Sequence, residues 1–151
     1  MNKLYSLYEK NIIEERPNKW TRSDVKALSN FEINMLVAHL LYRGQEDINI
    51  ACDIPTRDTV IVFQGEMSLA AYDFCKIAND AYPVMLKENI GIHKQMQKSN
   101  TGLGVRSRVM TNKWTAMVNA IPESDKYSDD IYISDENPLR AAMMAYLLKF
   151  G

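Results

Sequence analysis

The 151-residue sequence is poor in the residue types that build the commonest catalytic and metal centres, since it has only two cysteines and two histidines. Cys52 and Cys75 fit no metal-binding or redox spacing, so both are expected to be reduced, buried thiols. His39 and His93 are too few for a histidine-rich metal site, and neither lies in a repeated motif with a hydroxyl residue. No serine or cysteine is tied by a local motif to a histidine and an acid. No catalytic residue and no metal ligand is therefore predicted.

Long apolar runs and glycine-rich motifs are also missing. No run approaches the roughly 20 residues that a membrane-spanning helix needs, and the first residues mix charged with apolar side chains, unlike a signal peptide. Gly102-Leu103-Gly104 lacks the third glycine and the following helix of a dinucleotide fingerprint. The 46% hydrophobic and 25% charged fractions are those of a globular domain. We expect a cytoplasmic protein with no cofactor and no membrane partner.

Acidic residues are absent from one long stretch, residues 89–122. This stretch carries five basic residues: Lys94, Lys98, Arg106, Arg108 and Lys113. Residues 123–136 reverse the sign with six acidic residues and one basic one: Glu123, Asp125, Lys126, Asp129, Asp130, Asp135 and Glu136. Two interpretations stay open: two solvated loops that neutralise each other across the fold, or an anion-binding surface.

The N-terminal third of the chain contains two helix signals. Residues 3–15 have amphipathic spacing, and Arg16-Pro17 would end that helix. A polar connector is expected up to Leu28. Ser29 then has the character of an N-cap, with Glu32 three residues later, and the helix that follows should stop near Gly44. Residues 1–28 are thus predicted to be a helical extension, and residues 29–151 the main domain. The apolar side of the extension needs a partner, either its own domain or a second copy.

The middle of the chain alternates between strand and helix patterns. Residues 47–54 and 59–64 are rich in β-branched residues and flank a four-residue hairpin connection at 55–58. Residues 68–89 favour a helix, interrupted near Asn79-Asp80 and starting again close to Pro83. Further strands are expected at residues 90–96, 105–110, 113–120 and 131–134, with a hairpin tip at 98–102. This order predicts an α+β fold in which helices pack on an antiparallel sheet.

The last helix is the best specified. Asn137 is expected to cap it, and Pro138 occupies the first helical position, where the missing N–H has no cost. The apolar residues recur at three- and four-residue spacing and predict one stripe facing a core: Leu139, Ala142, Met143, Tyr146, Leu147 and Phe150.

The best ligand-binding constellation among the residues is Arg106, Arg108, Lys113 and Trp114. Arg106 and Arg108 are two apart, so on a strand they share a face, and their guanidinium groups suit phosphate oxygens. Trp114 would stack on a base, although a core position at a strand start explains it as well. A nucleotide or a single-stranded nucleic acid is therefore a candidate ligand. Duplex nucleic acid is not expected, because neither the overall charge nor a recognition helix supports it.

Four segments also occur in the order and spacing of a known family. They are Ser29-Asn30-Phe31-Glu32-Ile33-Asn34, Tyr72-Asp73-Phe74-Cys75 with Asn79-Asp80-Ala81-Tyr82-Pro83-Val84-Met85, Trp114-Thr115-Ala116, and Asn137-Pro138-Leu139-Arg140-Ala141-Ala142-Met143. Over about residues 29–150 the sequence resembles the phage NinX-like family, small accessory proteins of tailed bacteriophages with no established catalytic chemistry. Members commonly have Trp where Tyr82 stands. The first 28 residues and the basic hairpin around residues 94–112 depart from the pattern.

The resemblance adds Tyr82, Asn137 and Arg140 to the candidate ligand-binding residues. If the last helix begins beside the Trp114 strand, its N-terminus and Arg140 would favour an anion, although acidic residues precede it. The resemblance implies a phage protein in the host cytoplasm, which leads to the hypothesis of a non-catalytic binding protein that sequesters a nucleotide immune signal. The alternatives are an inhibitor that binds a host defence protein directly and, third, a nucleotide-cleaving enzyme. Homo-oligomers are compatible with each.

Overall fold

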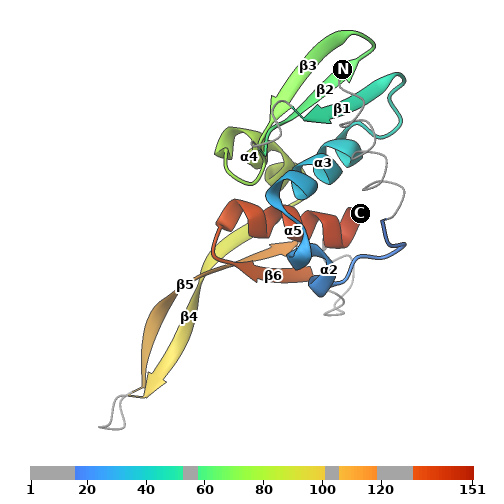
Figure 1. Cartoon of the computed structure of the whole chain (residues 1–151). Coiled ribbons are helices and arrows are strands. Elements are labelled where there is room, and N and C mark those ends of the chain that lie inside the picture. Colours follow the sequence, from blue (N-terminus) through green and yellow to red (C-terminus); the bar gives the residue numbers. More distant parts are fainter. Residues whose placement is uncertain (1–15, 53–57, 101–105, 119–130) are drawn as a thin grey trace.

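The protein is built from two three-stranded antiparallel sheets and four helices within the residues that its computed structural model describes, namely 16–52, 58–100, 106–118 and 131–151 (Figure 1). The first sheet has the order β1 (Ile48–Cys52), β2 (Val60–Gln64), β3 (Met67–Tyr72), and the second has the order β4 (Ile90–Asn100), β5 (Arg106–Val118), β6 (Ile131–Asp135). The helices are α2 (Arg22–Ala27), α3 (Asn30–Leu41), α4 (Ala78–Lys87) and α5 (Pro138–Phe150). The α+β class predicted from the sequence is confirmed.

The helices lie between the two sheets. Helix α3 packs on β1 and β2 of the first sheet, α5 packs on all three strands of the second, and α3 and α5 pack on each other. Figure 1 shows this order as successive layers, with α2 and α4 beside α5. The predicted single sheet is therefore two sheets, and the core occupies the space between them.

Helix α5 is the centre of this core. Its residues Ala141 to Leu147 are all buried, so the helix has no solvent face along two turns. The predicted single apolar stripe is therefore too narrow a description. The side chains at 141, 142 and 145 are alanines, which let the neighbouring helices and the second sheet approach α5 on all sides.

The helix starts predicted at Ser29 and at Asn137 are confirmed. Ser29 Oγ accepts a hydrogen bond from Glu32 N at 3.1 Å and caps α3, and Asn137 Oδ1 accepts from Leu139 N and Arg140 N and caps α5. Helix α3 ends at Leu41, just before the turn that contains Gly44 with φ of 86°. Local cap chemistry thus fixed these boundaries in the sequence.

The connector before Ser29 differs from its prediction. It contains the short helix α2, which begins with a reciprocal capping box between Thr21 and Asp24 and buries Val25. Asp24 Oδ2 accepts from Thr21 Oγ1 at 2.7 Å and from Thr21 N at 2.9 Å, and these bonds hold the pKa of the Asp24 carboxyl below its usual value. The sequence pattern Thr-x-x-Asp signals this start, but the segment is short and mostly polar.

The prediction of a helix starting at residue 68 is wrong, because residues 67–72 form strand β3. Gly65, with φ of 59°, and Glu66 make a two-residue connection that returns the chain alongside β2, with Gln64 opposite Met67. Gly65 N also donates to Asp47 O at 3.0 Å. Pairing with β2 therefore overrides the helix propensity of this segment. Helix α4 starts at Ala78, so Pro83 lies inside it rather than at its start.

Strand β5 is one continuous strand where the sequence predicted two, at residues 105–110 and 113–120. Residues 111–113 form an irregularity: Trp114 pairs with Lys94 and Met110 pairs with Met96, so three residues of β5 face Gln95 alone. Thr111 Oγ1 donates to Gln95 O at 2.8 Å and accepts from Lys113 N at 3.3 Å. The two strands continue as one long hairpin through this bulge.

Some predictions fall outside the described residues. These are the helix at 3–15, most of the connection at 55–58, the end of the hairpin tip at 98–102 and the acidic residues before Ile131. Among the helices in the described ranges, none is long and apolar enough to cross a membrane.

Candidate functional site

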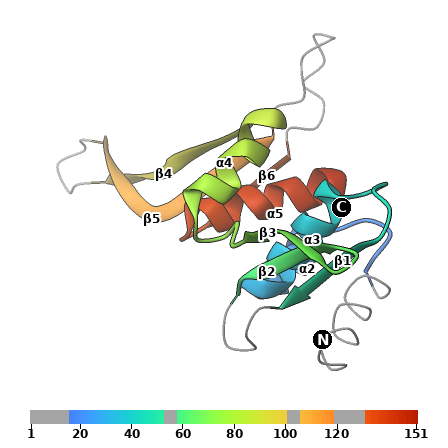
Figure 2. The same ribbon diagram turned by 90° about the horizontal axis from the view of Figure 1, so that it is seen from above.

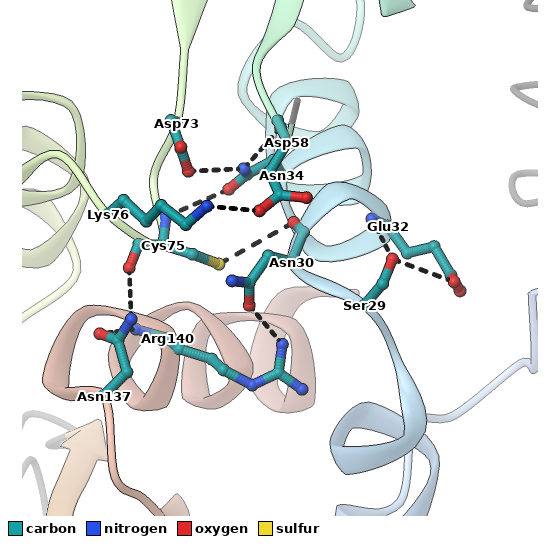
Figure 3. Close-up of polar contacts among 10 residues, drawn as sticks. All are labelled: Ser29, Asn30, Glu32, Asn34, Asp58, Asp73, Cys75, Lys76, Asn137 and Arg140. Carbon is teal, nitrogen blue, oxygen red and sulfur yellow. Dashed lines mark hydrogen bonds and ion pairs between the residues drawn. The ribbon is translucent and has the colours of Figure 1, made fainter. Parts of the chain in front are cut away.

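A group of polar side chains joins α3, the β3–α4 segment and the start of α5, and we call this group the polar junction (Figure 3). Its centre is Asn34, which is fully buried on α3. Asn34 Nδ2 donates to Asp73 Oδ1 and to Asp58 O, both at 2.9 Å, and Asn34 Oδ1 accepts from Cys75 N at 3.1 Å. One amide group therefore satisfies three partners that lie 24 to 41 residues away in the chain.

Asn137 connects α5 to the same segment. Its Nδ2 donates to Cys75 O at 2.8 Å, while its Oδ1 accepts from the amides of Leu139 and Arg140. Ala141 N donates to Asn137 O at 3.0 Å, and Pro138 has no N–H. The first four amide positions of α5 are thus accounted for within the chain, and the helix start presents none of them to an anion.

Arg140 holds α2 and α3 against α5. Its Nη1 donates to Asn30 Oδ1 at 2.7 Å, and its Nη2 donates to Leu28 O at 2.7 Å and to Lys26 O at 3.3 Å. Its Nε lies 3.6 Å from Asp135 Oδ1, and the Arg140 side chain is 15% exposed. The guanidinium therefore closes the C-terminal end of α2 and neutralises the acidic residue before α5.

Cys75 is the buried thiol of the junction. Its Sγ lies 3.9 Å from Asn30 O, and burial raises the pKa of the Cys75 thiol to about 12, against a smaller opposing effect of Arg140. The next residue, Lys76, is exposed and forms an ion pair with Asp58 at 2.7 Å. At neutral pH the thiol is almost fully protonated, so Cys75 is a packing residue rather than a nucleophile.

The polar junction is internally satisfied. Across the described ranges no buried side-chain nitrogen or oxygen lacks a hydrogen-bond partner. Asn137 and Arg140, two of the candidate ligand-binding residues, use their polar side-chain atoms in these internal hydrogen bonds. The junction accordingly holds α3, the β3–α4 segment and the start of α5 together.

A second place of interest is the root of the β4–β5 hairpin, where β6 ends. Trp114 on β5 is half-buried between two cross-strand neighbours, Lys94 on β4 and Asp135 on β6. Lys94 Nζ lies 5.9 Å from the centre of the Trp114 ring, within cation–π range. Lys113, which directly precedes Trp114 in the chain, is exposed. Helix α5 begins three residues after Asp135, so it does start beside the Trp114 strand.

Arg106 and Arg108 lie elsewhere on the same strand. Arg108 is paired with Lys98 and Arg106 with Asn100, at the far end of the hairpin. Because of the bulge the distance is counted along β4, where their partners Lys98 and Asn100 lie four and six residues from Lys94, the partner of Trp114. At about 3.4 Å per residue, Arg108 and Arg106 are therefore roughly 14 and 20 Å from Trp114. The structure therefore brings Lys94 beside Trp114 and leaves the two arginines outside that pair, while Lys113 is the chain neighbour of Trp114.

Tyr82 lies on the outer surface of α4. It is 50% exposed, and Leu86, one turn later, is 79% exposed, while Ala81, Val84 and Met85 on the other side are buried. Ile77, just before the helix, is also exposed. Tyr82 and Leu86 thus form an exposed apolar surface on α4, which we call the α4 face.

Sequence reasoning missed several residues that matter in these sites. The sequence places Asn34 and Asp73 in the segments that resemble the family, and Lys94 in the basic stretch, but it gives none of the three a role of its own. A polar residue between Ile33 and Met35 in the middle of an apolar helix is a usable signal for Asn34. The pairing of Lys94 with Trp114 depends on strand register, which the sequence does not reveal.

Comparison with protein families shows which family the chain belongs to. The family model described as bacteriophage P22 NinX matches residues 24–149. The chain belongs to this NinX family. Three of the four segments that carried the resemblance contribute residues to the polar junction, around 29–34, 72–75 and 137–140, whereas Trp114-Thr115-Ala116 does not. No curated protein and no solved structure matches the chain. The NinX family makes this a phage accessory protein, and its junction residues serve the fold.

Proposed function

We propose that this NinX family member is a binding protein that acts in the cytoplasm of the infected host and counters host immunity by sequestering a nucleotide signal without cleaving it. The observation that supports the proposal is the half-buried Trp114 with Lys94 beside its ring at the root of the β4–β5 hairpin. An aromatic ring next to a cation provides a surface for a base and a charge for its phosphate.

The charges around Trp114 favour an anionic ligand. On the β6 side the neighbour is Asp135, whose two carboxylate oxygens are used by Arg140 Nε at 3.6 Å and by Asn137 N at 2.9 Å. On the other side Lys94 has no acidic partner among the ion pairs of the described residues, and Lys113 is exposed. The acid beside the ring is thus neutralised, while the lysines supply net positive charge.

This arrangement changes which residues carry the proposed phosphate contacts. Lys94 and Lys113 replace Arg106 and Arg108, which lie at the far end of the hairpin, and Arg140, which is engaged by Asn30 and by α2. Tyr82 is assigned to the α4 face rather than to the nucleotide.

The α4 face supports the second candidate, an inhibitor that covers a host defence protein. Its two apolar side chains are exposed one turn apart on α4, and exposed apolar side chains of this kind are a common feature of protein-binding surfaces. In this case Tyr82 and Leu86 would insert into the host protein, and the root of the hairpin would have no ligand.

The test is a retention experiment with a matched pair of variants. Purified protein is mixed with cyclic and linear nucleotides, separated from free nucleotide by gel filtration and denatured, and the released molecules are identified by mass spectrometry. The variant Trp114→Leu/Lys94→Gln should reduce retention about 10- to 100-fold, since one stacked base contributes about 1–3 kcal/mol. The control is Tyr132→Leu/Arg22→Gln, which removes a second aromatic–cation pair of the same sheet, where Arg22 lies 4.6 Å from the Tyr132 ring.

Each outcome has a clear meaning. Intact nucleotide retained by the wild type and the control, but not by the Trp114 variant, supports sequestration. Altered nucleotide would mean an enzyme. No retained nucleotide, together with host-protein binding that Tyr82→Ser/Leu86→Ser abolishes, would replace the proposal with the inhibitor.

A further inference from the structure

Within the residues that the structure describes, the outer part of the β4–β5 hairpin is a two-stranded ribbon with no third strand paired to it. We call it the ribbon and define it as residues 96–100 of β4 and 106–110 of β5, which are paired from Met96↔Met110 to Asn100↔Arg106. The third strand, β6, pairs only with residues 114–118 of β5. Figures 1 and 2 show from two directions that the ribbon extends away from the helices.

The charge of the ribbon is of one sign. Three basic residues lie at its register positions, with Lys98 directly opposite Arg108 and Arg106 two residues further out. Its root adds Lys94 and Lys113, and the sequence from 89 to 122 contains no Asp or Glu. A protein partner normally presents charges of both signs, whereas a uniformly basic element matches a polyanion.

We propose that the ribbon binds duplex DNA by lying in the major groove, with its basic positions along the phosphates. Two strands about 4.8 Å apart form an element that the groove, about 12 Å wide, admits. Each DNA strand offers a phosphate about every 3.4 Å along the axis, so a ligand with repeated charges suits basic positions spread along the ribbon. A mononucleotide would contact only one of them.

The net charge of −1 does not oppose this binding. Salt screens charges beyond about 8–10 Å, and the ribbon extends roughly 20 Å from its root at Lys94 and Trp114. The acidic residues that the structure describes in the main body, such as Asp58, Asp73 and Asp135, therefore contribute little at its outer positions. Duplex nucleic acid was not expected from the sequence, because the sequence has no recognition-helix pattern and no positive total charge. In the proposed complex a pair of strands, not a helix, makes the contact.

The test measures DNA binding of the full chain by fluorescence anisotropy with a labelled 20-base-pair duplex. We expect a dissociation constant in the micromolar range at 50 mM salt, and a slope of about −3 in a plot of log affinity against log salt, as three phosphate contacts give. In the variant Lys98→Gln/Arg106→Gln/Arg108→Gln, affinity should fall at least about tenfold and the slope should approach zero.

The matched control is Lys19→Gln/Lys26→Gln/Lys87→Gln. It removes the same total charge from three exposed positions outside the hairpin, and it should change affinity less than about twofold. Circular dichroism and thermal melting verify that both variants are folded. Single-stranded DNA of the same length should compete more weakly than the duplex.

Three results would overturn the proposal. They are no duplex binding by the wild type at 50 mM salt, an equal loss in the control, and stronger competition by single strands. A change of oligomeric state in the ribbon variant would likewise overturn it, since the ribbon would then contact a second copy. Nucleotide retention at Trp114 is measured on the same ribbon variant and should be unchanged, so failure here is distinguishable from failure of the proposed function.

Discussion

The two halves of the β4–β5 hairpin have the same antiparallel pairing but very different surroundings. The inner half, from Ile90 to Lys94 and from Trp114 to Val118, is covered by α5 and paired with β6, and its residues Ala116 and Val118 are buried. The outer half, the ribbon, has neither a third strand nor a helix packed on it in Figures 1 and 2. The bulge at residues 111–113 separates them.

This difference separates stability from recognition. Burial of apolar side chains provides most of the stability of a fold, so the inner half belongs to the core. A two-stranded hairpin without further support is only marginally stable alone. Residues that must be free to bind are expected in such a region, and residues that must hold the fold are expected in the other.

Hydrogen exchange should show the largest difference between the halves. Paired amides of the ribbon should exchange at least about 1,000-fold faster, relative to their intrinsic rates, than paired amides of the inner half, because the inner ones open only with the core. Deuterium uptake of overlapping peptides from residues 90–100 and 106–118 gives the comparison. Equal protection would show that something unrecognised covers the ribbon.

The reactivity of the Cys75 thiol reports whether the body of the molecule, meaning the described residues outside the ribbon, is folded. Since the thiolate is the reactive form, raising the pKa from 9.0 to about 12 lowers the reactive fraction at pH 8 by about 1,000-fold. Iodoacetamide should therefore leave Cys75 unmodified in the folded protein, and reactivity should rise only as the pH approaches 12 or the body unfolds. Peptide mass spectrometry measures this, with the urea-unfolded protein as reference. Rapid labelling at pH 8 would contradict the buried position.

The substitution Asn34→Ala should destabilise the body by about 4 kcal/mol, because it leaves Asp73, the Cys75 amide and the Asp58 carbonyl without their partner and adds a cavity. Urea unfolding followed by circular dichroism measures the loss. Asn79→Ala, at an exposed position of α4, is the control and should change stability by less than about 0.5 kcal/mol.

Removal of the ribbon should have the smallest effect on stability. When residues 96–110 are replaced by Asn-Gly, which joins Gln95 to Thr111 through a short turn, the free energy of unfolding should change by less than about 1 kcal/mol. The same variant should lose DNA binding and keep its nucleotide retention. A large loss of stability would show that the ribbon packs on the body after all.

The sequence revealed those parts of the fold that local chemistry decides. The caps at Ser29 and Asn137 and the α+β class were predictable from neighbouring residues. Strand β3 was not, because its pairing with β2 outweighs its helix propensity, and α5 looked one-sided because its four-sided packing comes from elements far apart in the chain.

The candidate site was predictable in its residue types more than in its geometry. Trp114 and a nearby cation were expected together, but strand register selects Lys94 rather than Arg106 or Arg108. Arg140 was expected at a ligand because it starts a helix, whereas the structure shows it bound to the backbone of α2 and to Asn30. Long-range contacts of this kind leave no local pattern in a sequence.

The central position of α5 also has a consequence for the order of synthesis. Helix α3, against which it packs, begins at Asn30, and α5 begins at Pro138. At a translation rate of about 5–20 residues per second, roughly 5 to 20 s pass between the emergence of the two helices. During that interval the side of α3 that packs on α5 is uncovered, so we expect the nascent chain to bind host chaperones until α5 has been synthesised.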